Sequence, residues 1–336
     1  MSEYFRPILN SDAAMPDGAL RLAGGWTWFA HVERLSRDKP AQVIPAAQVP
    51  EEVLHRLTHP RPVIAGLTMD QPRLMGIVNV TPDSFSDGGD FALAEAAIAL
   101  GKAMVEGGAD ILDIGGESTR PFAQEVSLED EIVRVTPVIE ALVSTGAPIS
   151  TDTRKAAVAK GAMAAGARIL NDVSALRHDP ALGSFAAKTG LPICLMHMQG
   201  TPKTMALDPR YDNVLLDVYD QLAERITAAQ AAGIKRDAII LDPGIGFGKN
   251  AEHNLILLRN LSLFHDLGCP ILLGTSRKRF IDTVADVPVA KDRLPGSLAV
   301  ALAGIAQGVQ ITRVHDIKET RQALSLYKAV TGKGAL

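Results

Sequence analysis

Polar side chains follow apolar segments repeatedly along this chain. In the stretch A-D-I-L-D-I-G-G-E-S-T-R-P, residues 109–121, an apolar run interrupted only by Asp113 ends in glycines and then in a polar cluster. Such a run is typical of a strand buried on both faces. Polar residues end other apolar runs in the same way: Asn79, Asp152, Asn171, His197, Asp242, Ser276 with Lys278, and Arg313 with His315. The repetition predicts one site assembled from many strand ends.

The acids and the amide in this set favour a nitrogen heterocycle. Asp242 lies in L-D-P-G-I-G-F-G-K, after apolar residues and before a glycine-rich turn. A carboxylate buried there needs hydrogen-bond donors, which two adjacent N–H groups of a 2-amino-pyrimidinone ring would supply. Asp152 and Asn171 could bind the remaining edge of the same ring. Each residue alone could instead cap a loop, but the three together indicate a ligand site.

The cations Arg120, Lys278, Arg313 and His315 form a second group. Loops after the last strands of α/β barrels often hold phosphate, and Arg binds phosphate oxygens bidentately, so this group predicts a diphosphate ligand. His315 could instead be a metal ligand or a packed core histidine, although no second His stands at metal-site spacing. Lys278 could form a Schiff base, but its S-R-K-R setting favours ligand contact.

Two glycine-containing loops complete the candidate site. Gly244, Gly246 and Gly248 are spaced as in some phosphate loops, but the pattern does not match a P-loop, and we interpret it as a flexible turn. The loop T-P-D-S-F-S-D-G-G, residues 81–89, is rich in turn residues and includes Thr81, Asp83 and Ser84. It is expected to be a lid that excludes water, or else an ordinary polar connection.

From residue 73 onward, the apolar runs alternate with longer segments that carry apolar residues at helical spacing. The expected strands span residues 73–79, 110–115, 148–152, 168–173, 192–198, 238–242, 270–275 and 311–315. The expected helices span residues 93–106, 128–144, 155–165, 211–232, 252–267, 292–307 and 318–330. This pattern predicts an α/β fold, a (β/α)8 TIM barrel whose strands end at one mouth. An open doubly wound sheet would alternate similarly, but no dinucleotide fingerprint opens a helix.

Residues 1–70 differ from the rest, and we expect an N-terminal extension packed on a barrel domain of residues 71–336. The Gly24-Gly25 pair inside the segment Leu20 to Leu35 suggests a hairpin. The residues Pro50-Glu51-Glu52 favour a helix start. Nothing in the extension indicates chemistry, and a regulatory or oligomerisation role stays open.

Composition excludes several classes of protein. The chain has 336 residues, 47% of them hydrophobic, with a net charge of -4 and a pI of about 6.1. It lacks the broad basic face of a nucleic-acid-binding protein, and no apolar run approaches the length of a membrane span. The two cysteines, Cys194 and Cys269, lie in apolar runs and are expected to be buried reduced thiols. We therefore expect a cytoplasmic protein with no nucleic-acid or membrane partner.

A set of motifs resembles the bacterial dihydropteroate synthase family, the folate-pathway target of sulfonamides: G-I-V-N-V-T-P-D-S-F-S-D-G-G, D-I-L-D-I-G-G-E-S-T-R-P, L-D-P-G-I-G-F-G-K, T-S-R-K and R-V-H-D. The motifs occur in the family's order from about Arg73 to the end of the chain. The resemblance implies a TIM barrel, usually a homodimer. It also implies condensation of 6-hydroxymethyl-7,8-dihydropterin diphosphate with para-aminobenzoate.

The resemblance assigns roles to individual residues. Asp152, Asn171, Asp242 and Lys278 match the pterin contacts, and Asn79 matches a Mg²⁺ ligand near the diphosphate. Three further residues match substrate positions, with Arg313 also placed to stack on the ring: Thr119, Arg313 and His315. The aminobenzoate and diphosphate subsites correspond to Thr81, Asp83, Ser84, Arg120, Pro121, Phe247 and Ser276. Asp152, Asp242, Lys278 and Arg313 are the expected catalytic residues, and no general base is expected.

The chain departs from the family pattern in two places. Phe122 follows Arg120-Pro121 where the family often has Gly, and Arg279 follows S-R-K where many members have Ser. We expect these two departures to bear on the aminobenzoate pocket, and hence on sulfonamide affinity, and not on the pterin contacts. Two other functions remain open: a pterin-binding methyltransferase domain, which would not need the diphosphate cluster, and a catalytically silent pterin-binding paralogue, which would tend to lose loop residues.

Overall fold

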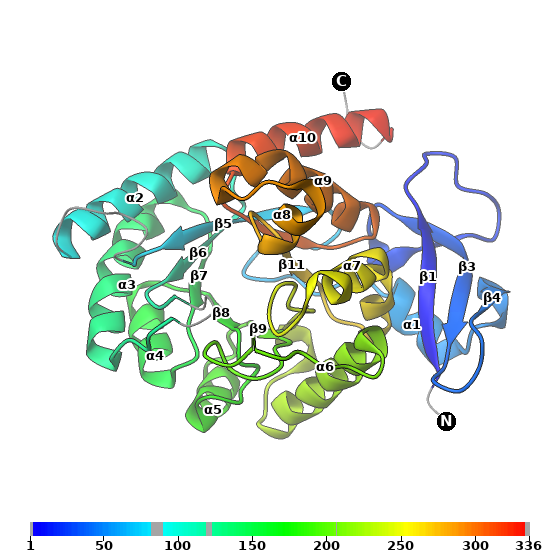
Figure 1. Cartoon of the computed structure of the whole chain (residues 1–336), viewed down its shortest axis with the longest axis horizontal. Coiled ribbons are helices and arrows are strands. Elements are labelled where there is room, and N and C mark those ends of the chain that lie inside the picture. The colour runs from blue at the N-terminus through cyan, green and yellow to red at the C-terminus, as the bar shows by residue number, and fades with distance from the viewer. Residues whose placement is uncertain (1–2, 82–89, 119–122, 206, 333–336) are drawn as a thin grey trace.

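The barrel consists of eight parallel strands in a single sheet (Figure 1). The computed structural model describes residues 3–81, 90–118, 123–205 and 207–332. The sheet order is β10-β9-β8-β7-β6-β5-β12-β11, and a parallel bridge between Leu241 and Ile271 brings its two edges together. The strands are β5 Arg73–Asn79, β6 Ile111–Gly115, β7 Ile149–Asp152, β8 Ile169–Asp172, β9 Ile193–Met196, β10 Ile239–Asp242, β11 Leu272–Gly274 and β12 Ile311–Val314. The prediction of a (β/α)8 TIM barrel is confirmed.

Helices surround the sheet: α2 Asp90–Glu106, α3 Leu128–Leu142, α4 Ala156–Ala165, α5 Pro180–Thr189, α6 Val214–Ala231, α7 Ala251–Arg259, α8 Arg279–Ala285, α9 Leu294–Ala306 and α10 Ile317–Val330. Short 3₁₀ turns lie between them: η4 Val143–Thr145, η5 Arg236–Ala238, η6 Leu261–Leu267 and η7 Ala290–Arg293. The expected helix over residues 252–267 is wrong in extent: the α-helix ends at Arg259, and Leu261–Leu267 form the 3₁₀ segment η6. The sequence pattern also missed α5 and α8.

Local sequence explains where several helices begin and end. The Ser127 side chain accepts a hydrogen bond from the Asp130 backbone N–H, and acidic residues fill the first turn of α3. Asp179 caps α5 in the same way, with Pro180 in its first turn and Gly190 in the left-handed conformation at its end. These signals locate the loops that leave the carboxyl ends of β6 and β8.

Alternation along the strands separates an apolar layer from a polar layer inside the barrel. Ile111, Ile169, Ile240 and Ile311 pack in one buried cluster. Inward-facing residues recur at every second position of a strand, so the next inward positions are Asp113, Asn171, Asp242 and Arg313. Cys194 lies in the apolar layer, and both Cys194 and Cys269 are buried and unpaired, as predicted. The polar layer therefore lies at the carboxyl ends of the strands, the mouth of the barrel.

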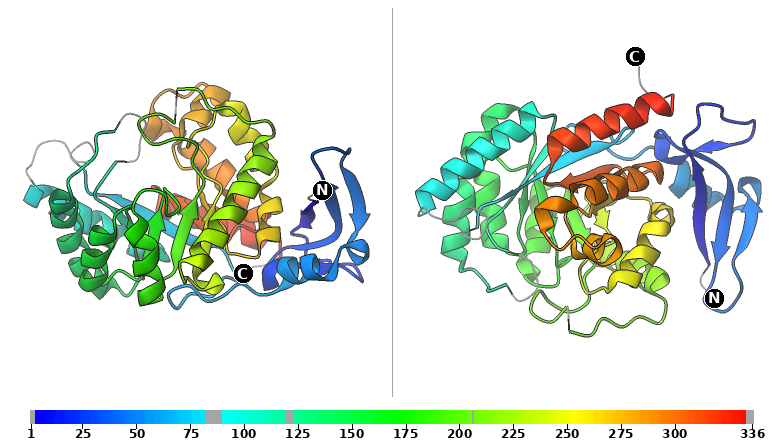
Figure 2. Two further views of the ribbon diagram at one scale, coloured as in Figure 1. Left: turned by 90° about the horizontal axis from the view of Figure 1, so that it is seen from below. Right: turned by 45° about the horizontal axis from the view of Figure 1, so that its top comes forward.

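The N-terminal extension forms a separate antiparallel sheet beside the barrel (Figure 2). Its elements are β1 Tyr4–Asn10, β2 Leu20–Arg21, η1 Leu22–Gly24, β3 Trp28–Leu35, β4 Gln42–Pro45, η2 Ala46–Gln48 and α1 Glu51–Thr58. β2 and β3 form the predicted hairpin, and α1 begins as predicted at Glu51. Arg56 of α1 pairs with the buried Asp266 at 2.7 Å, which ties the extension to the barrel.

The segment after α1 closes the barrel at the end opposite the mouth. Ile64 and Met69 are fully buried and belong to the same cluster as Met75 and Ile111, the lowest inward residues of β5 and β6. Ile64 and Met69 therefore form a plug that, among the described residues, covers this end of the barrel. Within the described part of the chain, the helices are all too short or too polar to cross a membrane.

Candidate active site at the mouth of the barrel

Arg313 joins two acids at the centre of the mouth. Its Nε donates to Asp113 Oδ2 at 2.6 Å, and its Nη2 donates to Asp152 Oδ2 at 2.9 Å. Asn171 Nδ2 donates to the same Asp113 oxygen at 2.9 Å. Asp113 Oδ1 is buried and has no hydrogen-bond partner among the described residues. The arrangement leaves acceptor capacity in the barrel that a ligand with N–H groups can use.

Burial and ion pairing have opposite effects on the pKa values of Asp152 and Arg313. Burial raises the pKa of Asp152 to about 7, although Arg313 opposes the shift. Burial alone would lower the pKa of Arg313, but Asp113 and Asp152 outweigh it and raise that pKa. The guanidinium is therefore always charged, whereas Asp152 can exchange a proton near neutral pH. A ligand that donates hydrogen bonds to Asp152 would favour its ionised form.

Asp242 and Lys278 form a second pair in the mouth. Asp242 Oδ1 accepts from the Gly244 backbone N–H at 2.7 Å, and burial raises the pKa of this acid against the effect of Lys278. Burial lowers the pKa of Lys278 to about 8, although Asp242 opposes that shift. A Cβ atom on Gly274 would lie 4.0 Å from Asp242 Oδ2 and 4.0 Å from Lys278 Nζ. The missing side chain at Gly274 thus leaves space beside both groups.

Lys278 also forms one wall of the site. Its Nζ donates to the Ile245 backbone carbonyl and lies 4.4 Å from the centre of the Phe247 ring. This is within the range of a cation–π interaction. Phe247 packs against an apolar cluster that includes Met196 and Met198. The mouth therefore combines an apolar wall with a polar floor, as expected for a flat aromatic ligand.

The glycine-rich turn after β10 is held by a half-buried lysine, Lys249. Gly244, Gly246 and Gly248 have φ angles of 67, 83 and 61°, which only glycine adopts readily. Lys249 Nζ lies 2.8 Å from His197 Nδ1 and donates to the carbonyls of Gly244 at 2.9 Å and Phe247 at 3.0 Å. Three acceptors match the three N–H donors of an ammonium group.

Several predicted residues lie at the rim of the mouth. Ser276 Oγ accepts from the His315 backbone N–H at 3.2 Å and lies 3.0 Å from His315 Nδ1. Thr81 is buried directly after β5. Asn79 ends β5, is half-buried, and makes no side-chain hydrogen bond within the described residues. Other predicted residues, Asp83, Ser84, Thr119, Arg120, Pro121 and Phe122, lie outside the described residues.

A resident Mg²⁺ ion would be held by few protein atoms here. No group of three or more His, Cys, Asp or Glu side chains within the described ranges could cage a metal. Mg²⁺ commonly binds one or two protein oxygens together with substrate phosphates and water. The available side-chain oxygen of Asn79 fits that mode.

The sequence reasoning missed two residues of the site. In the sequence Asp113 stands out only as an interruption of an apolar strand, yet it is fully buried and contacts Arg313 and Asn171. A charged residue in a strand buried on both faces is itself the signal, because such a charge needs partners. Lys249 carries no comparable signal, because the glycine spacing before it indicates only a flexible turn.

Comparison with known proteins places this site in a family. Residues 75–315 match the family model described as pterin binding enzyme. A dihydropteroate synthase of Escherichia coli (strain K12) is 47% identical over 264 residues, 78% of this chain and 93% of that protein. The corresponding protein of Neisseria meningitidis serogroup B is 47% identical over 78% of this chain and 94% of its own length.

Solved structures give the same result. The Xanthomonas albilineans dihydropteroate synthase with 4-aminobenzoic acid superposes with a TM-score of 0.76 at 48% identity, covering 81% of this chain and 98% of that one. The Yersinia pestis enzyme in a sulfonamide drug complex has a TM-score of 0.76 at 46% identity, covering 80% and 98%. The Xanthomonas albilineans enzyme with 7,8-dihydropteroate has a TM-score of 0.73 at 46% identity, covering 81% and 98%. The chain belongs to the pterin binding enzyme family.

Proposed function

We infer that this protein catalyses the dihydropteroate synthase reaction. It condenses 6-hydroxymethyl-7,8-dihydropterin diphosphate with para-aminobenzoate and releases 7,8-dihydropteroate and diphosphate. The observation that carries this inference is the grouping of Asp113, Asp152, Asn171 and Asp242 with two cations in one closed barrel. Acceptors for a ring rich in N–H groups and cations for a diphosphate thus lie in one cavity mouth.

The acids and the amide would hold the pterin. Asp242 and Asp152 accept from ring N–H groups, and Asn171 can accept through its side-chain oxygen because its Nδ2 is already engaged by Asp113. The wall formed by Phe247 and Lys278 covers the ring face. Held in this way, the electron-rich pterin stabilises positive charge at its exocyclic methylene carbon as the C–O bond breaks.

The cations would hold the leaving group. Lys278, Arg313 and His315 belong to the last two strand ends, where such barrels commonly bind phosphate. Asn79 would help to hold Mg²⁺, which would supply positive charge that stabilises the departing diphosphate. The arylamine is neutral at pH 7, attacks the methylene carbon without a general base, and releases one N–H proton to solvent once the C–N bond has formed. We assign its subsite to Arg120, Pro121, Phe247 and Ser276, following the family motifs.

The decisive experiment supplies purified protein with the pterin diphosphate, para-aminobenzoate and Mg²⁺. Dihydropteroate and diphosphate should be formed in equal amounts, and the variant Asp242→Ala should lose turnover. Absence of both products at saturating substrate would leave only a pterin-binding role. Full activity in Asp242→Ala would contradict the assignment of this acid to the pterin. Methyl transfer from a methyltetrahydrofolate would favour the methyltransferase alternative.

We also propose that the enzyme is a cytoplasmic homodimer. The two unpaired buried thiols suit a reducing compartment. Exposed apolar side chains on α8 and α10, Val284, Leu326 and Val330, are available for a subunit contact. Sedimentation of the full chain at micromolar concentration would test the dimer, and a purely monomeric species would contradict it.

A further inference from the structure

A cavity of about 100 Å³ lies outside the substrate contacts described above, between the loop after β8, the end of β9 and helix α6. We call it the side cavity, and its polar lining consists of Arg177, His197, Gln221, Glu224 and Arg225. Arg177 and Glu224 are exposed, so the side cavity can be reached from solvent. A volume of this size holds about three water molecules or one tetrahedral oxyanion such as phosphate.

His197 is the buried polar residue of this lining, and it ends one of the apolar runs of the sequence. Its backbone N–H donates to the Asp242 carbonyl at 2.9 Å, which continues the ladder between β9 and β10. Cys194 faces into the barrel, so Met196 does so too, and the side chain of His197 lies on the outer side of the barrel wall. His197 is therefore not part of the polar layer that would hold the pterin.

The two ring nitrogens of His197 have different surroundings. Nδ1 lies 2.8 Å from Lys249 Nζ, whose other two acceptors are the carbonyls of Gly244 and Phe247. An ammonium group donates all of its hydrogens, so Nδ1 accepts and the ring proton lies on Nε2. Nε2 is buried and makes no hydrogen bond with the described residues. A buried N–H group without an acceptor is costly, so Nε2 needs one from a ligand or from water.

The surroundings of this ring are positively charged. Burial, and after it the charges of Lys249 and Arg177, lower the pKa of His197 well below its ordinary value, so the ring is neutral. Gln221 lies close enough to oppose this shift but does not complete a hydrogen bond to Nε2. A negatively charged acceptor would therefore suit Nε2 better than a neutral one.

Two guanidinium groups line the side cavity, and their charges are poorly neutralised. Arg177 donates to the backbone carbonyls of Ser174 at 3.0 Å and Met198 at 2.5 Å, and it forms no ion pair with a described residue. Burial, and after it the charge of Arg225, lowers the pKa of Arg177, so the two cations repel each other. Arg225 pairs with Glu224, its neighbour on α6, whose side chain is largely exposed. An exposed pair of this kind contributes little.

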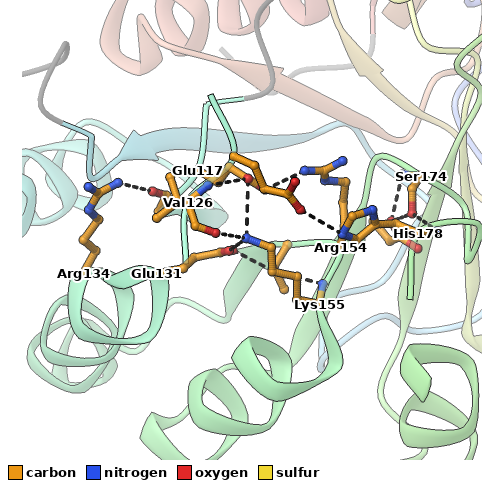
Figure 3. A network of polar contacts seen from close by, with 12 residues as sticks. Glu117, Val126, Glu131, Arg134, Arg154, Lys155, Ser174 and His178 are labelled. Atoms are coloured by element: carbon orange, nitrogen blue, oxygen red, sulfur yellow. Dashed lines mark hydrogen bonds and ion pairs between the residues drawn. The ribbon is translucent and has the colours of Figure 1, made fainter. Parts of the chain in front are cut away.

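Charged groups elsewhere beside the mouth are matched by partners, as Figure 3 shows for a second buried network. Lys155 Nζ donates to Glu131 at 2.7 Å and to the Val126 carbonyl at 2.6 Å, and Arg154 donates to Glu117 at 2.8 Å. Carboxylates and cations balance in that network. The side cavity instead combines one N–H donor and two guanidinium groups with a single exposed acid, and an anion bound there would meet all three donor groups.

We propose that the side cavity is a binding site for one small inorganic oxyanion of the phosphate class. Its oxygens would accept from His197 Nε2 and from the guanidinium groups of Arg177 and Arg225, since guanidinium binds such oxygens bidentately. The bound anion would also fix the ring of His197, whose Nδ1 contacts the lysine that holds the glycine-rich turn. This site is separate from the diphosphate contacts of the mouth, and it does not depend on the proposed function.

The test follows the ring nitrogens of His197 by NMR in the full-length protein with ¹⁵N-labelled histidine. The resonances of His197 are assigned by their absence in His197→Gln. Inorganic phosphate replaces chloride at constant ionic strength, because added salt alone would screen the exposed charges. His315, which belongs to the mouth, reports separately on phosphate that binds there.

We expect a neutral His197 ring with its proton on Nε2, and a saturable shift of the Nε2 signal as phosphate is added. Arg225→Gln should raise the phosphate Kd on the order of 10-fold, because one charge-assisted hydrogen bond is lost. Glu224→Gln should lower the Kd by about 2- to 5-fold, because it removes the acid that competes for Arg225 in an exposed pair. Both side chains are at least partly exposed on α6, so both variants should fold.

Arg321→Gln is the matched control, because Arg321 also donates to a backbone carbonyl, that of Gly108, at the opposite end of the barrel. It should leave the phosphate Kd measured at His197 within about 2-fold. A ring proton on Nδ1, a response of His315 alone, or an unchanged Kd in Arg225→Gln would overturn the proposal. Diphosphate is titrated in parallel, and tighter binding of diphosphate than of phosphate at His197 would overturn the assignment to a single oxyanion.

Discussion

Asp113→Asn tests the reasoning about the floor of the site most directly. Asp113 is fully buried and accepts from both Arg313 Nε and Asn171 Nδ2 through one oxygen. The substitution keeps the size of the side chain but removes its charge, so Arg313 keeps only the Asp152 carboxylate as an ionic partner. Losing one charge-assisted hydrogen bond costs about 1.5–3 kcal/mol.

Most of that loss should appear as weaker pterin binding, because Arg313 and Asn171 lose the group that orients them. We expect the pterin Kd to rise on the order of 10- to 100-fold, at about 1.4 kcal/mol per factor of ten. Calorimetric titration with a pterin lacking diphosphate measures the change. Asp110→Asn is the matched control, because Asp110 pairs with Arg321 and Arg73 at the opposite end of the barrel.

The control should lower the melting temperature and leave the pterin Kd within about 2-fold. If Asp113→Asn bound the pterin as tightly as the unaltered protein, Asp113 would not orient its two neighbours, and the account of the polar layer would be wrong. A loss equal to that in Asp110→Asn would show a general effect on folding instead.

Other predictions address the remaining parts of the site. Burial lowers the pKa of Lys278 to about 8, so this side chain is protonated, and can bind diphosphate as a cation, only below that pH. The KM for the pterin diphosphate should therefore rise above pH 8 in the unaltered enzyme. A KM that stays constant up to about pH 9.5, which is still below the ordinary lysine pKa, would contradict the role of Lys278 in diphosphate binding. Lys249→Met leaves three acceptors without their donor and should lower kcat/KM by at least about tenfold, with activity partly restored in Lys249→Arg; full activity of Lys249→Met would show that the turn needs no support. Chelation of Mg²⁺ should abolish turnover reversibly. Asn79→Ala should raise the Mg²⁺ concentration that gives the half-maximal rate. If this concentration is the same in Asn79→Ala and in the unaltered enzyme, Asn79 is not a Mg²⁺ ligand. Phe122→Gly should change sulfonamide inhibition more than KM for the pterin substrate, and equal changes would refute this.

Barrel strands were predictable to within a few residues because parallel strands buried on both faces are nearly continuous apolar runs. The helices were harder. Segment Pro180–Thr189 consists largely of small residues, with three alanines, one glycine and one serine among ten, so its apolar and polar faces hardly differ. Segment 252–267 keeps apolar spacing past Asn260, although the backbone there leaves the α-helical conformation. In the extension, β1 was missed because Pro7 interrupts a strand pattern.

The residues that belong to the site were easier to predict than the hydrogen bonds and ion pairs that they form with one another. Strand-end position identified Asp152, Asn171, Asp242 and Arg313, because parallel strands of a barrel all end at one mouth. Which acid meets Arg313 depends on strands far apart in sequence, since Asp113 lies 200 positions away. Local pattern carries no information on that contact. Glycine spacing likewise could not reveal that Lys249 reaches back to the carbonyls of its own turn.

The plug formed by Ile64 and Met69 bears on how the protein can be shortened. A fragment starting at residue 71 would keep every predicted catalytic residue, yet it would open the underside of the barrel to water and expose Met75 and Ile111. Burial of such side chains is worth about 1.5–3 kcal/mol each, so that fragment should express as an aggregate. A fragment starting just after α1 would retain both plug residues, and is the better choice for crystallisation trials.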